Sequence, residues 1–158
     1  WTGPRIVKTL VSILFLGWFF LFPTALFAEL VSDVDDGGVL TLESGKRVSL
    51  VGVTFDEEGV SVLRVLVRKK DVNLQLIARS TSAAQEAAYV YLQSKSMPFP
   101  FRQGEAPGEQ EVLVNELLVK LGAAKVDVAQ DFSRKAKFLK VQAEAEKKGL
   151  GVWSYEVS

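Results

Sequence analysis

The sequence predicts a mainly β fold with added helices, folded as one domain. Short runs in which apolar residues alternate with polar ones, such as Asp71 to Ala78, predict strands. Near the C-terminus Leu113, Leu117 and Leu121 recur every four residues, which predicts a helix over 112–121. The length of 158 residues is that expected of a single domain.

The remaining elements follow from the same patterns and from turn residues. Helices are expected over 58–68 and over a C-terminal segment that carries Phe138, Val141 and Ala145 and ends at Gly149. Asp and Gly residues at 35–38 predict a turn or a bulge, because both tolerate positive φ. The expected strands are 31–34, 39–42, 47–53, 71–78 and 87–92.

Composition limits the chemistry that the chain can perform. Basic and acidic residues balance at 19 each. The chain therefore lacks the excess of positive charge that would indicate a large nucleic-acid-binding surface. Cysteine and histidine are both absent, which excludes a disulfide, a thiolate site and the commonest general base. A metal ion would therefore need oxygen ligands, as Ca²⁺ or Mg²⁺ does.

The N-terminus has the layout of an export signal. Arg5 and Lys8 precede an uncharged, Leu- and Phe-rich run over 9–28, which Pro23 interrupts near its end. Cleavage after Ala28 would make Glu29 the new terminus. If the run stays uncleaved, its roughly 20 residues are long enough to act as a membrane anchor. Residues 1–28 are thus expected to be a signal peptide or an anchor, and both place the domain across a membrane.

The C-terminal third resembles the thermonuclease, or staphylococcal nuclease-like, family. That family typically carries "LVNxxLVxxGLAxV", a linker, and a helix that ends "AxxxxxGxW". Matches to the first part are Leu113, Val114, Asn115, Leu118, Val119, Gly122, Ala124 and Val126. Matches to the second part are Ala143, Ala145, Lys148, Gly149, Gly151 and Trp153.

The resemblance implies an α+β fold, with a five-stranded OB-type β-barrel and about three helices, two of them C-terminal. It covers about Val31 to Tyr155, so residues 29–158 are expected to form the domain. Strands 39–42 and 47–53 occupy the place of the family's hairpin, which reads roughly "V-x-D-G-D-T", a turn, then "V-R-L-x-G-I-D-x-P-E".

The family hydrolyses DNA and RNA with Ca²⁺, and the resemblance gives positions for its site residues. Two aspartates hold the metal, one glutamate orients water, and two arginines neutralise charge on the phosphate. In this sequence the metal aspartates are replaced by Gly38 and Thr54, and the arginines by Ser49 and Gln85. Only Glu57, at the catalytic glutamate, matches.

Four of the five positions have therefore lost their charge, which predicts an inactive site. One lost charge-stabilising contact typically costs ~10²–10³ in rate. Glu57 is interpreted as a solvated acid near a helix start, with a surviving catalytic role as the alternative. Asp36 and Asp56, together with Asp35 and Glu58, are weaker candidates for a shifted acidic metal site.

The function predicted from sequence is an exported, non-catalytic binding or scaffold module at the cell envelope. The alternative is a divergent Ca²⁺-dependent nuclease that acts on DNA or RNA through Glu57 and relocated acids. A non-specific nucleic-acid binder is a third possibility. A protein partner is expected to use the apolar and proline-rich loop over 93–110, whereas a membrane would be a partner only if residues 9–28 stay uncleaved.

Overall fold

A closed five-stranded barrel forms the centre of the molecule. The computed structural model describes residues 27–77, 85–98 and 110–155. Hydrogen-bonded neighbours follow the order β3-β2-β1-β5-β6, and β6 also pairs in parallel with β3, which closes the sheet. This is the topology of an OB-type barrel, as predicted. The barrel strands are β1 (Phe27–Val34), β2 (Leu40–Leu42), β3 (Arg47–Leu50), β5 (Asp71–Leu76) and β6 (Glu86–Gln93).

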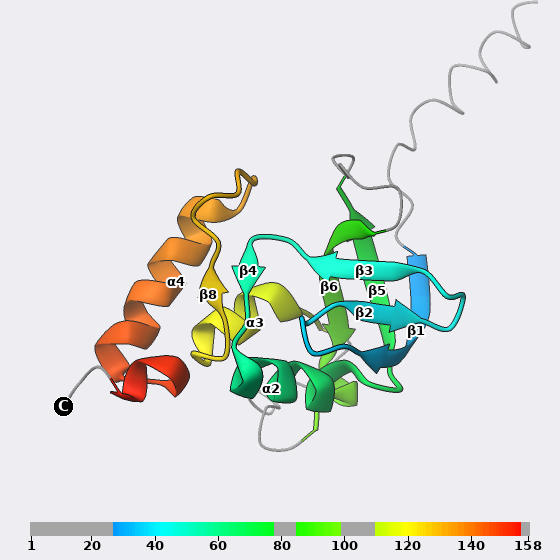
Figure 1. Cartoon of the computed structure of the whole chain (residues 1–158), viewed down its shortest axis with the longest axis horizontal. Coiled ribbons are helices and arrows are strands. Elements are labelled where there is room, and N and C mark those ends of the chain that lie inside the picture. Colours follow the sequence, from blue (N-terminus) through cyan, green and yellow to red (C-terminus); the bar gives the residue numbers. More distant parts are fainter. Residues whose placement is uncertain (1–26, 78–84, 99–109, 156–158) are drawn as a thin grey trace, which may run out of the picture.

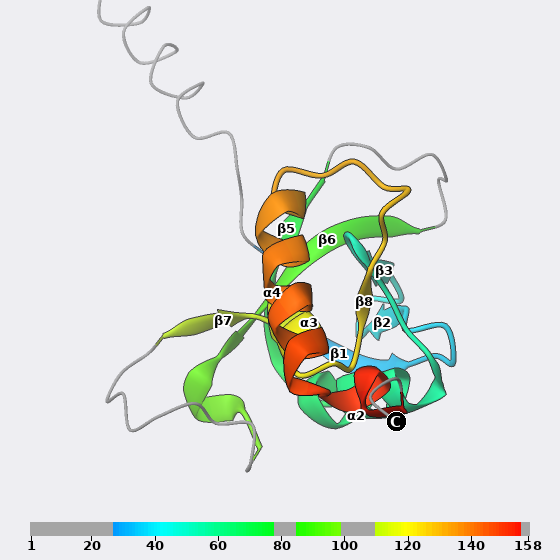
Figure 2. The same ribbon diagram turned by 90° about the vertical axis from the view of Figure 1, so that its left-hand side faces the viewer.

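In the part of the chain that the structure describes, three α-helices and a second small sheet pack around this barrel. In Figure 1, α2 lies below the barrel and α4 lies on the side away from β1, with α3 between α4 and the strands. Figure 2 shows α4 across the front of the molecule, with α3 behind it. The helices are α2 (Glu57–Val67), α3 (Val114–Lys120) and α4 (Lys135–Lys148). The small sheet pairs β4 (Val53–Thr54) with β8 (Lys125–Val126), and the short 3₁₀ helices are η1 (Ser94–Ser96) and η2 (Gly151–Tyr155). Among the described residues, no helix is long and apolar enough to cross a bilayer.

One polar side chain lies wholly inside the apolar core. Asn115 of α3 is fully buried, and its Oδ1 accepts the N–H of Val90 at 2.9 Å. Its amide donates to the carbonyls of Val51 at 3.0 Å and Ala88 at 3.2 Å. Because these bonds reach β6 and the end of β3 from one side chain, Asn115 joins the closing seam of the barrel to α3.

The C-terminus docks through a close crossing of two glycine backbones. The N–H of Val152 donates to the carbonyl of Gly122 at 2.9 Å. A Cβ on Gly122 would lie 2.1 Å from the carbonyl oxygen of Leu150, and a Cβ on Gly151 would lie 2.2 Å from the carbonyl oxygen of Gly122. Neither glycine therefore has room for a side chain. Trp153 follows and is only 9% exposed, so it is part of the packed interior where the C-terminus docks.

Three predicted boundaries were wrong. The helix expected from Val112 begins at Val114, because 111–113 form strand β7 (Glu111–Leu113) and pair with the end of β6. The strand expected over 47–53 ends at Leu50, because the chain turns at Gly52, whose φ is +77°, and continues as the separate strand β4. The first strand begins at Phe27 rather than Val31 and pairs with β5 from there.

Part of the expected 93–110 loop is ordered against the barrel. β6 extends to Gln93, η1 follows, and Met97 is buried. Residues 99–109 of that loop, which include Phe99 and Phe101, lie outside the described residues. Most of the expected signal or anchor, residues 1–26, also lies outside them.

Candidate functional site

The five positions that the resemblance assigns to catalysis lie in five different segments in and around the barrel. Gly38 lies in the turn between β1 and β2, and Ser49 lies on β3. Thr54 ends β4, Glu57 begins α2, and Gln85 directly precedes β6. One pocket beside these positions, about 420 Å³ in volume, is lined by Asp36, Phe55, Asp56, Glu57, Val60, Ser61 and Arg64. The structure thus brings Asp36, Asp56 and Glu57 to one pocket.

Asp35 organises the turn that carries Gly38. Its Oδ1 accepts the backbone N–H groups of Gly37 at 2.9 Å and Val39 at 3.0 Å, and its Oδ2 is bound by the Arg47 guanidinium. Partial burial raises the pKa of Asp35. The bonds from Val39, Gly37 and Arg47 outweigh it and lower the pKa below its ordinary 3.8. Asp35 is therefore a structural anion of the turn.

Gly38 cannot carry a metal ligand in this structure. Its φ is +79°, and a Cβ built on it would lie 2.6 Å from the ring of Phe55. Real Cβ atoms essentially never approach another heavy atom so closely. The half-buried Phe55 ring therefore fills the space that an aspartate at position 38 would occupy.

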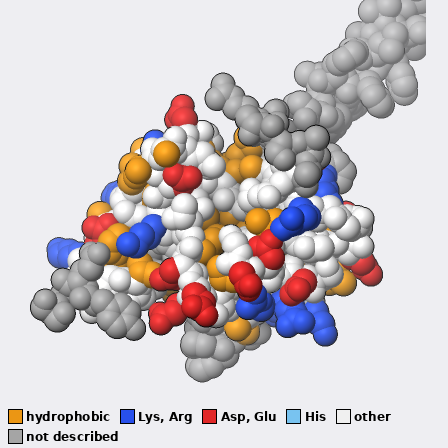
Figure 3. Space-filling view, in the orientation of Figure 1, with side chains coloured by type: hydrophobic (Ala, Val, Ile, Leu, Met, Phe, Trp, Pro, Cys, Tyr) orange, Lys and Arg blue, Asp and Glu red, His pale blue; other side chains and the backbone are white. Residues whose placement is uncertain are grey.

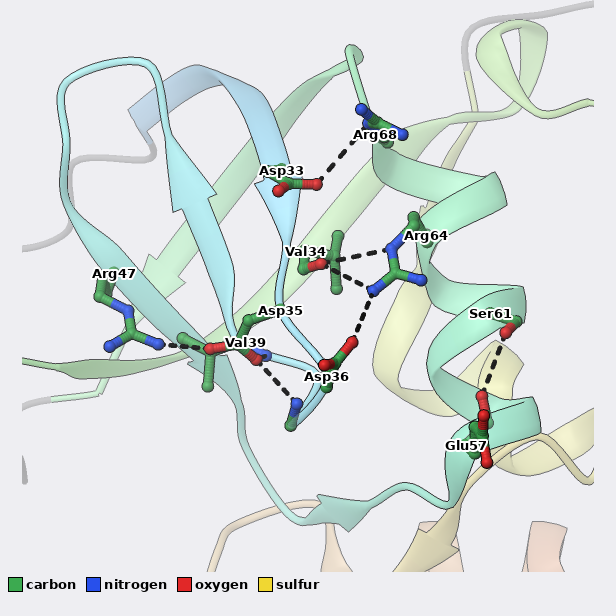
Figure 4. Close-up of polar contacts among 11 residues, drawn as sticks. Asp33, Val34, Asp35, Asp36, Val39, Arg47, Glu57, Ser61, Arg64 and Arg68 are labelled. Carbon is green, nitrogen blue, oxygen red and sulfur yellow. Dashed lines mark hydrogen bonds and ion pairs between the residues drawn. The ribbon is translucent and has the colours of Figure 1, made fainter.

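Arg64 is a cation of this pocket that the sequence reading missed. It extends from α2 and donates to the carbonyl of Val34 at 3.0 and 3.3 Å, and one of its nitrogens lies 3.4 Å from the fully exposed carboxylate of Asp36 (Figure 4). One turn further along α2, Arg68 lies 3.7 Å from Asp33. The sequence did offer a signal, because Arg64 and Arg68 are four residues apart and therefore lie on the same face of the predicted helix.

Asp56 and Glu57 have local roles at the start of α2. Asp56 is the N-cap residue, and its carboxylate accepts the N–H of Gly59 at 2.7 Å. Glu57 is the first helical residue and is exposed. Figure 4 shows it apart from the Asp36–Arg64 pair. A carboxylate in the first turn suits the helix dipole.

The residues present do not fit a bound Ca²⁺ ion. Calcium takes 6–8 oxygen ligands in proteins. Within the described ranges, no three acidic side chains are grouped so that they could hold a metal. Asp36 is paired with Arg64, one oxygen of Asp56 caps α2, and the Phe55 ring fills the space beside Gly38.

Neither arginine position retains a group that could neutralise a phosphate. The hydroxyl of Ser49 donates to the carbonyl of Glu86 at 3.3 Å, and Gln85 is uncharged. Arg47, two residues before Ser49, is engaged by Asp35. Charges of both signs are interspersed on the face shown in Figure 3.

A second pocket, of about 820 Å³, opens between the barrel and residues 129–133. Tyr89 has an aromatic ring of the kind that can stack on a base, and it lines this pocket, but it is only 3% exposed. Its hydroxyl lies 3.1 Å from that of Ser133, and its ring packs edge-on against Phe138. Tyr89 is therefore part of the core rather than an open stacking surface.

Comparison with known proteins finds a matching family and similar solved structures. Residues 80–155 match the family described as "Staphylococcal nuclease homologue". A similar solved structure is the extended Tudor domain of Drosophila melanogaster Tudor-SN (p100), with a TM-score of 0.47 and 15% sequence identity. That alignment covers 96% of this chain and 88% of the other. No curated protein matches the chain in sequence. The matched residues 80–155 include β6, α3 and α4, so this part of the chain is similar to staphylococcal nuclease homologues.

Proposed function

We propose that this domain acts by binding and not by catalysis, as an exported binding or scaffold module at the cell envelope. One observation carries the proposal. The position of a metal ligand is occupied by Gly38, and the space in front of it is filled by the Phe55 ring. A phosphodiesterase of this family would need a cation there to stabilise charge on the phosphate.

The other substitutions support the same conclusion. Thr54, Ser49 and Gln85 bring no charge to the positions of the second metal ligand and the two arginines. Transition-state charge would then go unneutralised, and each such loss typically costs several kcal/mol. Export rests on sequence alone, because the basic flank and the apolar run over 9–28 have the layout of a signal or an anchor.

The alternative is a divergent nuclease, which one observation favours. Arg64 places a guanidinium in the same pocket as Asp36, Asp56 and Glu57. An arginine that faced a bound phosphate could neutralise charge there. Its present bonds to Val34 and its pairing with Asp36 turn it toward the protein, so binding remains the preferred function.

The deciding experiment is a cleavage assay on the purified full-length chain in mild detergent. Single-stranded DNA and RNA are incubated with Ca²⁺ or with a chelator, using wild type, Glu57→Ala and Glu58→Ala. Glu58 is the matched control, because it is the next exposed glutamate of the same helix turn. We expect no metal-dependent cleavage. Cleavage that Ca²⁺ supports, that Glu57→Ala abolishes and that Glu58→Ala leaves unchanged would establish the nuclease instead.

Binding of nucleic acid without cleavage is separated by salt. A module that contacts phosphates weakens steeply as salt rises and does not respond to Ca²⁺. A protein-binding module does not bind the added DNA or RNA, so it shows neither salt-dependent binding nor Ca²⁺-dependent cleavage. The expected protein partner would use the 93–110 segment, so its capture by the intact chain should be lost when that segment is altered.

A further inference from the structure

We infer that the ring of Phe55 has taken the position of the metal ion, so that an apolar contact now holds the β1–β2 turn against the start of α2. This inference rests on the proposed non-catalytic function and says how the site remains ordered without an ion. It makes Phe55 and Gly38 a matched pair, each of which requires the other.

The first support is the place of Phe55 in the chain. It lies between Thr54, the last residue of β4, and Asp56, the N-cap of α2. Its ring is half-buried and packs against the apolar core. Two pockets, of about 440 and 420 Å³, are both lined by Phe55, Asp56 and Glu57. Both pockets therefore border Phe55 and the start of α2.

The second support is the fit of Gly38 to that ring. The ring atoms nearest to a Cβ at position 38 would lie at 2.6, 3.0 and 3.3 Å, so the ring would meet any side chain there directly. Gly38 is buried, and its positive φ also disfavours other residues. Because position 38 is a glycine, the Phe55 ring can pack directly against the backbone of the β1–β2 turn.

The consequence is that one substitution cannot restore the ion site. An aspartate at position 38 would have to displace the ring, and removal of the ring alone would leave an apolar gap with no ligand. Charge at the turn is also balanced internally, since Arg47 binds Asp35 and Arg64 approaches Asp36. Both changes are needed together before a cation can replace the aromatic contact.

The test compares two glycines with similar backbones and different surroundings. Gly45 has φ +87°, and a Cβ there would meet nothing within 4 Å, whereas Gly38 has φ +79° and faces Phe55. Gly45→Ala should lower the Tm of the chain by about 2–8 °C, the cost of positive φ alone. Gly38→Ala should lower it at least twice as much. In a Phe55→Ala background, the excess at position 38 should disappear.

The second arm asks whether the ring occupies the place of an ion. The triple variant Gly38→Asp/Thr54→Asp/Phe55→Ala restores both ligand positions and removes the ring. It should gain thermal stability from Ca²⁺ relative to chelator, as ligand binding to the native state requires. The control Gly45→Asp/Thr54→Asp/Phe55→Ala places one of the two carboxylates on an open turn and should gain nothing. Wild type should also show no Ca²⁺-dependent shift.

Each outcome decides one claim. Equal costs at Gly38 and Gly45, or an unchanged excess without the ring, would overturn the matched pair. An excess that vanishes with the ring, but no Ca²⁺ response in the triple variant, would overturn the claim that ring and ion share a position. These melts use no nucleic acid, so the inference can fail while the domain remains inactive. Cleavage by wild type would instead defeat the proposed function.

Discussion

Asn115→Ala should be the most damaging change of a single polar residue in the described barrel. The substitution removes three hydrogen bonds that lie in a fully buried place. The carbonyl of Ala88 keeps a second donor, the N–H of Val51, at 3.0 Å. The N–H of Val90 and the carbonyl of Val51 each lose their hydrogen bond to the Asn115 side chain and stay buried. Because a buried polar group left unpaired costs about 1–3 kcal/mol, the free energy of unfolding should fall by about 2–5 kcal/mol.

Urea unfolding followed by circular dichroism measures this loss. A domain of this size is stable by about 5–15 kcal/mol, so the midpoint should move far toward lower urea. Asn73→Ala is the matched control, because Asn73 bonds the exposed side chain of Glu111 at the surface. That change should stay within about 1 kcal/mol. If Asn115→Ala unfolds within about 0.5 kcal/mol of wild type, the argument that this side chain secures the barrel seam is refuted.

Three further changes test other contacts. Gly122→Ala should cost about 2–4 kcal/mol, because the Cβ would lie 2.1 Å from the Leu150 carbonyl; amide exchange at Val152 should accelerate while the barrel strands stay protected, and unchanged exchange would contradict the reasoning. Phe138→Ala should cost about 3–5 kcal/mol, since the ring is fully buried; a loss below about 1 kcal/mol in urea would show that the core closes around the gap. Asp35→Asn should destabilise fully above the ordinary pKa of 3.8 and progressively less as pH falls through the lowered folded-state pKa. Urea midpoints of the wild type and the variant should therefore converge once the pH falls below the folded-state pKa, and a constant gap would rule out the carboxylate as the cause.

Much of the fold followed from local pattern. The last helix ends at Gly149 in the left-handed conformation, where the sequence placed its stop, with φ of 62°. The predicted turn at 35–38 exists because Asp35 satisfies its N–H groups. The start of α3 was misplaced because Leu113 fits the helical period, while its backbone bonds to Tyr91 in β6. Such a pairing depends on residues over twenty positions away and leaves no trace in a local window.

The sequence predicted which charged residues the candidate site lacks, but it did not predict which side chains now fill the site. Uncharged residues at positions 38, 49, 54 and 85 could be read directly from the sequence. That Phe55 fills the space at Gly38 could not, because the contact joins a turn to the start of a helix. Arg64 was missed for the same reason. Its acceptors, Val34 and Asp36, lie about thirty residues before it.

The parallel seam between β3 and β6 also affects how the chain reaches its folded state. It pairs Val48 with Glu86, and the Asn115 amide that secures the same seam bonds a carbonyl 64 positions earlier. Folding dominated by such distant pairings is slow, on the order of milliseconds to seconds, because the chain must close large loops before it gains contacts. The barrel thus closes only after most of its sequence has been made. A chain that stays open for that interval can be threaded through a narrow channel, and this suits the export proposed above.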